Sequence, residues 1–412
     1  MRLTLKSLAT IVPVFLLAST AAAQQWSDDK TKVAATVAGE ILKQAPQSPS
    51  VAIGISIDGA PVMMEGYGIA NPLTGAKATA TTPYQIGSLT KQMTAALILS
   101  LTEPKRQGPT LLPIKTSQAL SLDTTLDTIL PQAQSWTPLG KVKIRHLLNM
   151  QSGFQNFTKL DPKAPGMPDT TSTITPTDMM KFINLMMEVK PQSFAPGTGY
   201  GYSNTNYYLL SEVAEKVVGA GAVGRMPLYR NLLQNRVFKP AGLTETGFLN
   251  GAWNTPGMAV AAYDTTKGNW NKPSWPKGAG DVTSSVRDML RWHAALMGGK
   301  VINQNSLKAM FTPVAPVGQV NGVPVFYGMG WTVMSLGEFD WYSHSGSIEG
   351  FSAHDGIFVN RKTGRWVSAV ILTNQYKVKL DQRTSCLAQL AMDNATLAKN
   401  INPLIYAGCS AP

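Results

Sequence analysis

The sequence predicts a mixed α/β fold of the α+β type, in which an antiparallel sheet is flanked by helices and joined to a mainly helical lobe. Strand-like apolar segments lie near both ends of the chain, and most patterns between them are helical. Asp58-Gly59 between two strand-like segments also predicts a β-hairpin. The two ends must therefore share one sheet. We assign residues 24–412 to a single domain, with an α/β lobe from 24–105 and 281–412 and a helical lobe over 106–280.

The first 23 residues predict a cleaved signal peptide. Arg2 and Lys6 precede an apolar run from Leu8 to Ala18, and Ala21-Ala22-Ala23 before Gln24 fits a cleavage site. The apolar run is too short to span a bilayer, and no cysteine near the cleavage site offers a lipid anchor. We therefore expect a periplasmic or secreted protein without a transmembrane anchor.

Composition indicates an ordered globular protein. About 390 residues follow the signal segment, enough for one large domain, and the chain is 44% hydrophobic and 15% charged. The formal charge is +12, or +10 without Arg2 and Lys6 of the signal segment. This positive charge either serves solubility or attracts the protein to anionic wall or membrane polymers. No basic run is interleaved with aromatic residues, which disfavours nucleic-acid binding. The histidines lack metal-ligand spacing, so we expect no metal or cofactor; they are His146, His293, His344 and His354.

The N-terminal half divides into recognisable elements. We expect a helix over 28–45, a hairpin of Val51–Ile57 and Pro61–Tyr67, and a helix that begins at Ser88. Further helices are predicted over 143–153, ended by Gly153, over 176–189, from 204 onward and over 228–238. The segments expected to be loops, the last of them bordering a cleft, are 103–117, 154–175 and 250–280.

The C-terminal part is predicted to return to strands. A helix over 282–296 with a Ser/Thr cap comes first, and strands begin after Tyr327. The remaining elements are strands over 330–333, 344–351, 352–359 and 365–373, a turn over 360–364 and a helix over 381–399. Cys386 and Cys409 are expected to form a disulfide in an oxidising compartment; two free thiols are the alternative.

Ser88-x-x-Lys91 is the stretch with the clearest chemistry. The residues after Ser88 read as a helix with an uninterrupted apolar run from Ala95 to Leu101. Lys91 then lies one turn from Ser88 on the same face, so the hydroxyl and the amine are within hydrogen-bond reach. The positive end of the helix dipole lies behind the hydroxyl, which suits an activated serine nucleophile.

The same motif occurs twice more, so its context matters. Ser27…Lys30 lies in the polar start of the mature chain, and Ser274…Lys277 contains Pro276 among Gly, Asn and Pro residues. Neither context predicts a buried helix. An arbitrary match is a surface serine with a solvated lysine, and only Ser88 follows a glycine turn and opens an apolar helix.

Two later segments complete a pattern. A glycine-rich loop delivers Tyr202-Ser203-Asn204 to the start of a helix, and His344-Ser345-Gly346 comes near the C-terminal strands. With Ser88-x-x-Lys91, this order resembles the three motifs of the penicillin-recognising serine hydrolases. It is similar to the branch with class C β-lactamases, D-Ala-D-Ala carboxypeptidases, D-aminopeptidases and related esterases. The resemblance covers about residues 30–400 and implies a β-lactamase/transpeptidase-like fold with its active site between the two lobes.

Residue roles follow from this resemblance and from acyl-transfer chemistry. Ser88 is the expected nucleophile, and Lys91 and Tyr202 share proton transfer, with the acylation base left open. Asn204 is expected to contact the substrate amide or orient Lys91. His344 is expected to relay a proton between Tyr202 and the leaving group, or to bind a substrate carboxylate. Ser345, Gly346 and Ser347 join Asn204 in substrate binding, and the backbone N–H groups of Ser88 and Ser347 form the oxyanion hole.

Three look-alike features are interpreted as structural. Lys362-Thr363-Gly364 matches the Lys-Thr-Gly of β-lactamases literally, but it lies in a predicted hairpin turn. Tyr229-x-Asn231 lies inside a predicted helix without a glycine-rich loop before it. His146 and His293 are interpreted as helix-packing residues.

The leading functional prediction is an exported D-Ala-D-Ala carboxypeptidase-like peptidase that forms an acyl-enzyme on Ser88. His344 stands where β-lactamases carry Lys, and a His is mostly neutral at pH 7. This disfavours efficient β-lactam hydrolysis and favours peptide or ester hydrolysis. The alternatives are an esterase, amidase or β-lactamase on small substrates, and a catalytically silent penicillin-binding-like scaffold. The expected partner is a small molecule or a peptide, including the peptidoglycan stem peptide; the oligomeric state is left open.

Overall fold

A computed structural model of the chain describes residues 26–44, 49–103, 120–159, 176–190, 192–218, 228–248, 257–259 and 276–392. The signal segment, the predicted loop over 103–117 except Glu103, and Cys409 lie outside these residues. None of the described helices is both long enough and apolar enough to cross a bilayer.

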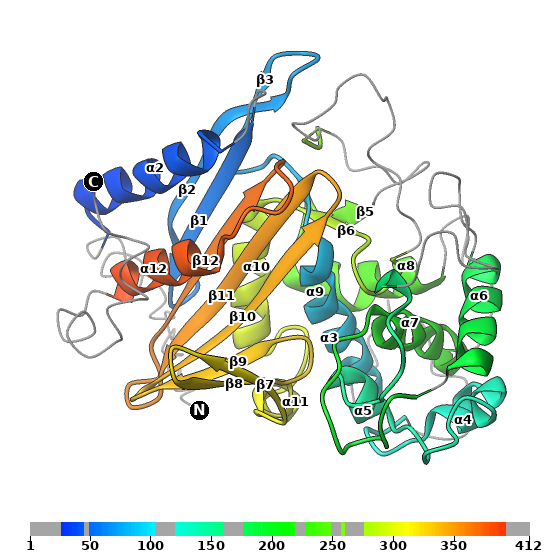
Figure 1. Cartoon of the computed structure of the whole chain (residues 1–412). Helices are drawn as coiled ribbons and strands as arrows, with labels where there is room; N and C mark the ends of the chain where they lie inside the picture. Colours follow the sequence, from blue (N-terminus) through cyan, green and yellow to red (C-terminus); the bar gives the residue numbers. More distant parts are fainter. Residues whose placement is uncertain are drawn as a thin grey trace, which may run out of the picture.

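A nine-stranded antiparallel sheet, with the order β3-β2-β1-β12-β11-β10-β9-β8-β7, runs through the molecule (Figure 1). The first strands of the chain lie beside the last, because β1 pairs with β12 from Val51↔Thr373 to Ile57↔Val367. The strands are β1 (Ser50–Ile57), β2 (Ala60–Asn71), β3 (Ala76–Lys77), β7 (Ala315–Val320), β8 (Val323–Tyr327), β9 (Thr332–Leu336), β10 (Phe339–Ile348), β11 (Phe351–Asn360) and β12 (Trp366–Thr373).

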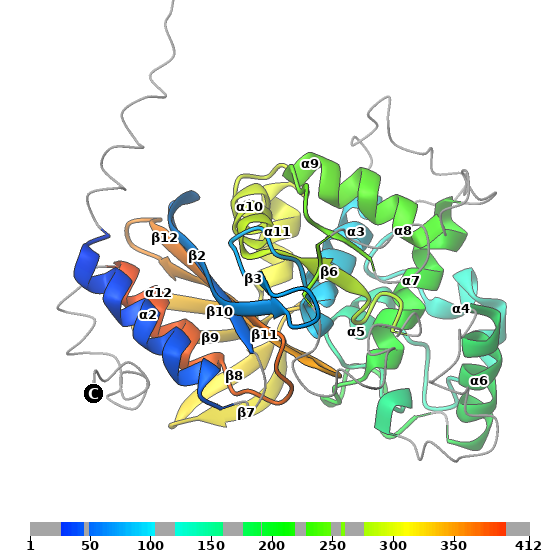
Figure 2. The ribbon, with the colours of Figure 1, turned by 90° about the horizontal axis from the view of Figure 1, so that it is seen from above.

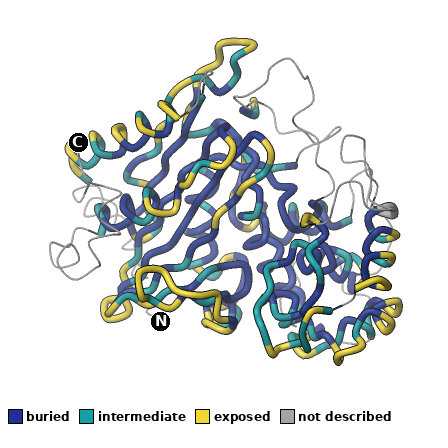
Figure 3. Tube along the Cα trace, in the orientation of Figure 1, coloured by how far each residue is buried: buried dark blue, intermediate teal, exposed yellow. Residues whose placement is uncertain are grey.

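Helices cover both faces of this sheet (Figure 2). On one face lie α2 (Asp28–Leu42) and α12 (Asp381–Met392), which share an apolar core with the odd-numbered residues of β1 and β12, such as Ile53 and Ile371. On the other face, α10 (Val286–Met297) and α3 (Thr90–Thr102) contribute to a second and larger core. The central strands are buried along most of their length because both faces are covered (Figure 3).

The larger core continues into a group of helices beside the sheet. Its members are α4 (Leu126–Ile129), α5 (Ile144–Leu148), α6 (Pro176–Val189), α7 (Asn204–Val218), α8 (Leu228–Leu233) and α9 (Lys239–Ala241), with α11 (Gln304–Phe311) nearer the sheet. A π-helical turn, Gln234–Phe238, links α8 to α9. A small sheet of order β4-β6-β5 joins the two regions; its strands are β4 (Tyr84–Gln85), β5 (Gly247–Phe248) and β6 (Val282–Ser284).

The predicted fold class is confirmed, and most predicted elements are present. The hairpin over 51–67, the helix over 176–189 and the turn over 360–364 lie where the sequence placed them. The helix expected over 381–399 is observed as α12 to Met392, with the rest outside the described residues.

Four local predictions were wrong. Residues 282–284 form strand β6 rather than the start of a helix, because Ser285 caps α10 through the Asp288 N–H. The C-terminal strands begin at Ala315, before Tyr327, since β7 and β8 add a hairpin at the edge of the sheet, with β7 mostly exposed. The helix over 143–153 ends at Leu148, where Met150 adopts a φ of +59° ahead of Gly153. His344 is not at the start of a strand but is the sixth residue of β10.

Candidate active site

Ser88 lies on a 3₁₀ turn that leads directly into α3. The turn is Gly87–Leu89, and every residue of α3 from Thr90 to Leu101 is buried. Gly87 has a φ of +51°, and a Cβ there would lie 3.0 Å from the Ser347 backbone nitrogen. A glycine is required at this position because the backbone is left-handed and the two segments touch. The helix N-terminus behind Ser88 supplies a partial positive charge.

Four of the predicted residues meet around the Ser88 hydroxyl. Lys91 Nζ is 2.9 Å from Ser88 Oγ, and Tyr202 Oη is 3.0 Å from the same oxygen. Lys91 Nζ also donates to Asn204 Oδ1 at 2.7 Å and to the Ala279 carbonyl at 2.8 Å. These contacts join the start of α3, the loop before α7 and the turn before β6.

The orientation of the Asn204 amide is fixed by its other contacts. Its Nδ2 donates to Thr158 Oγ1 at 3.0 Å and to Asn156 Oδ1 at 3.4 Å, so Oδ1 faces Lys91. Asn204 Oδ1 and the Ala279 carbonyl can only accept hydrogen bonds. A neutral Lys91 amine has two hydrogens for these two acceptors, which leaves its lone pair facing the Ser88 hydroxyl.

The electrostatics of the site favour that neutral amine. Lys91 is fully buried, and burial lowers the pKa of its ammonium well below the usual value. Burial raises the pKa of the Tyr202 phenol, and its hydrogen bond to Ser88 Oγ opposes that rise only in part. Burial thus shifts the pair toward an amine and a phenol, and the neutral amine is the stronger proton acceptor of the two.

The Ala279 carbonyl was missed by the sequence predictions. The turn that carries it is fastened to α3 on both sides of Lys91: Thr94 Oγ1 donates to the Gly278 carbonyl at 2.7 Å, and the Val282 N–H donates to Thr90 Oγ1 at 3.2 Å. Thr90 and Thr94 lie one turn apart on this buried helix, with Lys91 between them. A backbone carbonyl leaves no signal in a sequence, so only the fold identifies this acceptor.

His344 contacts a tyrosine that was also missed. Its Nδ1 lies 2.6 Å from the Ser345 carbonyl and therefore carries the proton, because a carbonyl only accepts. In the neutral ring Nε2 is then the acceptor for the Tyr327 hydroxyl, 3.0 Å away. Burial lowers the pKa of His344 to about 4, so the ring is neutral at pH 7. Tyr327 also packs edge-on against the Tyr202 ring, with centroids 6.3 Å apart.

The predicted oxyanion segment lies against the nucleophile turn. A Cβ on Gly346 would come within 2.0 Å of the Ile86 carbonyl, so β10 and the Gly87–Leu89 turn are in close contact. The pairing of β10 with β9 ends at Ser343↔Thr332. The half of β10 from His344 to Ile348 therefore runs beyond β9, beside the Ser88 turn.

The look-alike motifs have other roles in the structure. Lys362 lies in the turn after β11, where its 77%-exposed side chain pairs with Glu338. Ser27 caps α2, and Lys277 forms buried ion pairs with Glu212 and Glu215. Tyr229 lies in α8 and its hydroxyl contacts Thr94 Oγ1 at 2.8 Å.

His293 belongs to a buried polar network beneath the sheet. Its Nε2 is 2.9 Å from Asp355 Oδ2, and the Gln92 amide nitrogen donates to Asp355 Oδ1 at 2.7 Å. Trp292 Nε1 donates to Gln92 Oε1 at 3.0 Å. The network thus connects α10 with β11 and with α3, at the residue that follows Lys91, and His293 does more than the helix packing that was predicted.

Cys386 is buried within α12 and is disulfide-bonded. Cys409 is outside the described residues, so the pairing of the two cysteines stays a prediction.

Comparison with known proteins identifies one family. The family model described as Beta-lactamase matches residues 31–390, nearly the whole described chain. The chain is 28% identical over 335 residues to a protein of Bacillus subtilis described as a putative penicillin-binding protein, PbpX, covering 80% of this chain and 72% of that protein.

Two further relatives carry the names of D-specific hydrolases. A D-aminopeptidase of Brucella canis is 25% identical over 317 residues, which cover 75% of this chain and 54% of the relative. This chain thus spans about half of that relative. The crystal structure of the D-amino acid amidase of Ochrobactrum anthropi matches with a TM-score of 0.66 and 20% identity, over 90% of this chain and all of that one.

Proposed function

Because this chain belongs to the beta-lactamase family of serine hydrolases, we propose that it hydrolyses the amide bond that follows a D-amino acid in short peptides of the D-Ala-D-Ala type. The observation that carries the proposal is the hydrogen-bonded cluster of Ser88, Lys91 and Tyr202. In both a D-Ala-D-Ala peptide and the substrate implied by the name D-aminopeptidase, a D-residue supplies the carbonyl that is attacked.

Acylation of Ser88 follows from the proton positions in the cluster. Ser88 Oγ attacks the substrate carbonyl carbon, and its proton passes to the lone pair of Lys91 Nζ 2.9 Å away. The backbone N–H groups of Ser88 and Ser347 stabilise the oxyanion that forms. Asn204 Oδ1 and the Ala279 carbonyl hold the resulting ammonium in place. Lys91 is therefore the acylation base.

Loss of the leaving group depends on Tyr202, the other residue that hydrogen-bonds to Ser88 Oγ. The carbon–nitrogen bond breaks, the departing amine nitrogen takes the Tyr202 hydroxyl proton, and Tyr202 regains a proton from Lys91 through the shared cluster. Water then attacks the acyl carbon, with the same groups working in reverse order, and releases the acid. His344 stays neutral and positions Tyr327 beside the Tyr202 ring.

A second candidate function, D-amino acid amidase or aminopeptidase activity, is favoured by the neutral state of His344. A C-terminal carboxylate needs a cationic partner, but His344 is neutral at pH 7 and burial disfavours the charged form of Lys91. An amide substrate has no such requirement.

Two measurements test these proposals. The intact mass of the purified protein is determined after incubation with a penicillin and, separately, with a fluorophosphonate, and Ser88→Ala is the control. Hydrolysis of a D-Ala-D-Ala peptide, of D-phenylalanine amide and of their L-counterparts is followed in parallel. We expect labelling at Ser88 and hydrolysis of D-configured substrates only, and Ser88→Ala to abolish both while the protein stays folded.

Each result separates the candidates. A penicillin adduct with peptide hydrolysis supports the carboxypeptidase-like function, and fluorophosphonate labelling with amide hydrolysis alone supports the amidase. Labelling without D-selectivity favours a small-molecule esterase. Labelling by neither reagent would overturn the hydrolase mechanism in favour of a silent scaffold.

The proposed location is the periplasm or the medium, on the basis of residues 1–23 alone. The expected result is a mature protein that begins at Gln24 in the periplasmic fraction of an expressing bacterium, as shown by N-terminal sequencing. An uncut chain in the cytoplasm would contradict it.

A further inference from the structure

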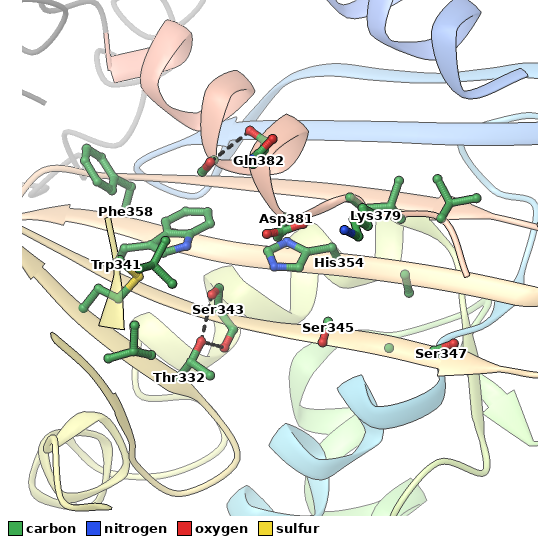
Figure 4. Close-up of a pocket in the computed structure, with 18 of the residues that line it drawn as sticks. Thr332, Trp341, Ser343, Ser345, Ser347, His354, Phe358, Lys379, Asp381 and Gln382 are labelled. Atoms are coloured by element: carbon green, nitrogen blue, oxygen red, sulfur yellow. Dashed lines mark hydrogen bonds between the residues drawn. The ribbon is translucent and has the colours of Figure 1, made fainter. Parts of the chain in front are cut away.

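A pocket of about 510 Å³ lies on the α12 face of the sheet, across β10 and β11 from the helix that carries Ser88 (Figure 4). Side chains alternate along β10, so Ser343, Ser345 and Ser347 line the pocket while His344 faces the catalytic cluster. Neither Ser88, Lys91, Tyr202 nor His344 lines it. This volume is within the range of small-molecule sites.

His354 is the central polar group of the pocket wall. It lies opposite Ser345 in the β10–β11 register and is 4% exposed. Its buried Nδ1 has no hydrogen-bond partner among the described residues. Buried polar atoms are nearly always paired in native proteins, so an unpaired ring nitrogen in a pocket wall indicates a ligand or an ordered water.

Charged side chains of both signs line the same pocket, namely Lys377, Lys379 and Asp381. Lys379 and Asp381 both line it, and neither side chain forms an ion pair within the described part of the chain. Asp381 is also the first residue of α12, whose N-terminal N–H groups favour an anion. The pocket thus has a place for a positive group and a place for a negative group.

One end of the pocket is apolar. The Trp341 indole lies across Gly356, where a Cβ would come within 2.1 Å of the ring, and its centroid is 6.4 Å from that of His354. Phe358 packs edge-on against Trp341, with centroids 5.9 Å apart. Figure 4 shows these two rings at one end of the pocket, His354, Lys379 and Asp381 in its middle, and Ser347 at the other end.

We propose that this pocket is a second ligand site, which binds a free amino acid with an apolar side chain. The ammonium group binds Asp381, the carboxylate binds Lys379 and the start of α12, and the side chain packs on Trp341 and Phe358. His354 completes its hydrogen bonding with the ligand. Because Ser88 is on the other face of the sheet, this binding does not require the proposed hydrolysis.

The test is isothermal titration calorimetry of the full chain with D- and L-phenylalanine as probes. Two analogues test the two charged contacts separately: 3-phenylpropionate lacks the ammonium group and phenethylamine lacks the carboxylate. They are titrated into the wild type and into Asp381→Asn, Lys379→Met and His354→Gln. Because Asp381 and Lys379 are exposed, their substitution keeps the test valid if His354→Gln fails to fold.

We expect one phenylalanine per chain, bound at least tenfold more weakly by Asp381→Asn and by Lys379→Met. Asp381→Asn should leave the affinity for 3-phenylpropionate unchanged or higher, and Lys379→Met should do the same for phenethylamine. Lys362→Ala, an exposed lysine in the turn at the end of β11, is the matched control and should bind like the wild type.

Two results would overturn the proposal. The absence of binding heat would mean that water alone satisfies His354. Binding that Asn204→Ala abolishes and that the pocket variants leave unchanged would place phenylalanine in the catalytic cluster instead. A loss of hydrolytic activity in the same preparations would bear only on the proposed function, since binding is measured without turnover.

Discussion

At the scale of single residues, the chemistry depends on a lysine that cannot reach solvent. Lys91 is fully buried, and two fixed acceptors take two of its hydrogens. The remaining position on Lys91 Nζ, which holds the lone pair of the neutral amine, faces Ser88 Oγ. The same burial that lowers the pKa of Lys91 raises that of Tyr202. One physical cause therefore makes the amine a base and keeps the phenol a proton donor.

The first prediction concerns pH. Since the neutral Lys91 amine accepts the serine proton, kcat/KM should rise with pH and reach a plateau well below pH ~10.4, the usual titration point of a lysine. The raised pKa of Tyr202 predicts that the plateau does not fall again up to pH 10. Stopped-flow acylation across pH 5–10 measures this profile.

Lys91→Arg is the control, because an arginine stays charged at every pH of the series. Its acylation rate should be about 10²- to 10⁴-fold lower than that of the wild type, which is the usual contribution of a general base. This rate should also not increase with pH as the wild-type rate does. A wild-type rate that still climbs above pH 9 would contradict a depressed Lys91 pKa.

The second prediction concerns Tyr327. Tyr327→Phe keeps the ring but leaves buried His344 Nε2 without its donor. A buried group deprived of its partner costs about 1–3 kcal/mol of the free energy of unfolding. We expect that loss in urea denaturation, together with a lower kcat and a nearly unchanged KM, because Tyr327 acts through the position of its neighbours.

Tyr200→Phe is the matched control, since Tyr200 lies in the same aromatic group, with its ring centroid 6.1 Å from that of Tyr327. It should keep both stability and kcat. Equal losses in the two variants would show that ring packing, and not the His344 contact, is what Tyr327 contributes.

At the scale of elements, the site is made by contact between β10 and the turn before α3. Gly87 lies against the Ser347 backbone and Gly346 against the Ile86 carbonyl, so closely that neither position has room for a Cβ. This contact brings Ser347 beside Ser88, although 258 intervening residues separate them in the printed sequence.

The third prediction tests that contact. Gly346→Ala would place a methyl group within 2.0 Å of the Ile86 carbonyl, so β10 must move away from the Ser88 turn. Losing one oxyanion donor costs about 10²- to 10³-fold in kcat, and we expect a loss of this size in hydrolysis of the preferred substrate.

Gly39→Ala in α2 is the control, because the added Cβ would have no atom within 4 Å. It should add about 0.5–1 kcal/mol to the free energy of unfolding without changing kcat. Full activity in Gly346→Ala would contradict the assignment of Ser347.

Local patterns were sufficient to predict the elements that carry the motifs. The hairpin over 51–67 has period-two apolar residues with an Asp-Gly turn, and α3 has a long apolar run, so both were predictable. Strand β6 was not, because Val282–Ser284 is too short for a period and directly precedes a helix cap. The Ala279 carbonyl and the Tyr327 hydroxyl were not predictable either, since they join the site through tertiary contacts that no spacing encodes.

At the scale of the whole molecule, one buried network connects the two sides of the site. The Asp355 carboxylate in β11 accepts a hydrogen bond from the Gln92 amide of α3 and forms a second hydrogen bond with His293 of α10. All three side chains are fully buried. They hold the nucleophile helix against the sheet, so the position of Ser88 relative to β10 depends on them.

The fourth prediction compares this buried His293–Asp355 hydrogen bond with an exposed ion pair. Asp355→Asn replaces one of the two buried carboxylate oxygens by an amide N–H group, and losing a buried hydrogen-bond acceptor costs about 1–3 kcal/mol of the free energy of unfolding. Lys362→Ala breaks the exposed pair with Glu338 and should cost at most about 1 kcal/mol. Denaturant unfolding of both variants measures the difference. Lys362→Ala should also keep the wild-type rate; a large loss of rate there would make Lys362-Thr363-Gly364 the third catalytic motif after all.

The pairing of β1 with β12 also fixes when this protein can fold. A ribosome makes β1 within the first 57 residues, but its neighbour β12 ends at Thr373. The central part of the sheet cannot close until nearly the whole chain has been synthesised, and Lys91 has no sheet to be buried against before then. A nascent chain of this topology therefore remains unfolded for most of its synthesis, which is the state in which a polypeptide can be threaded through a narrow channel.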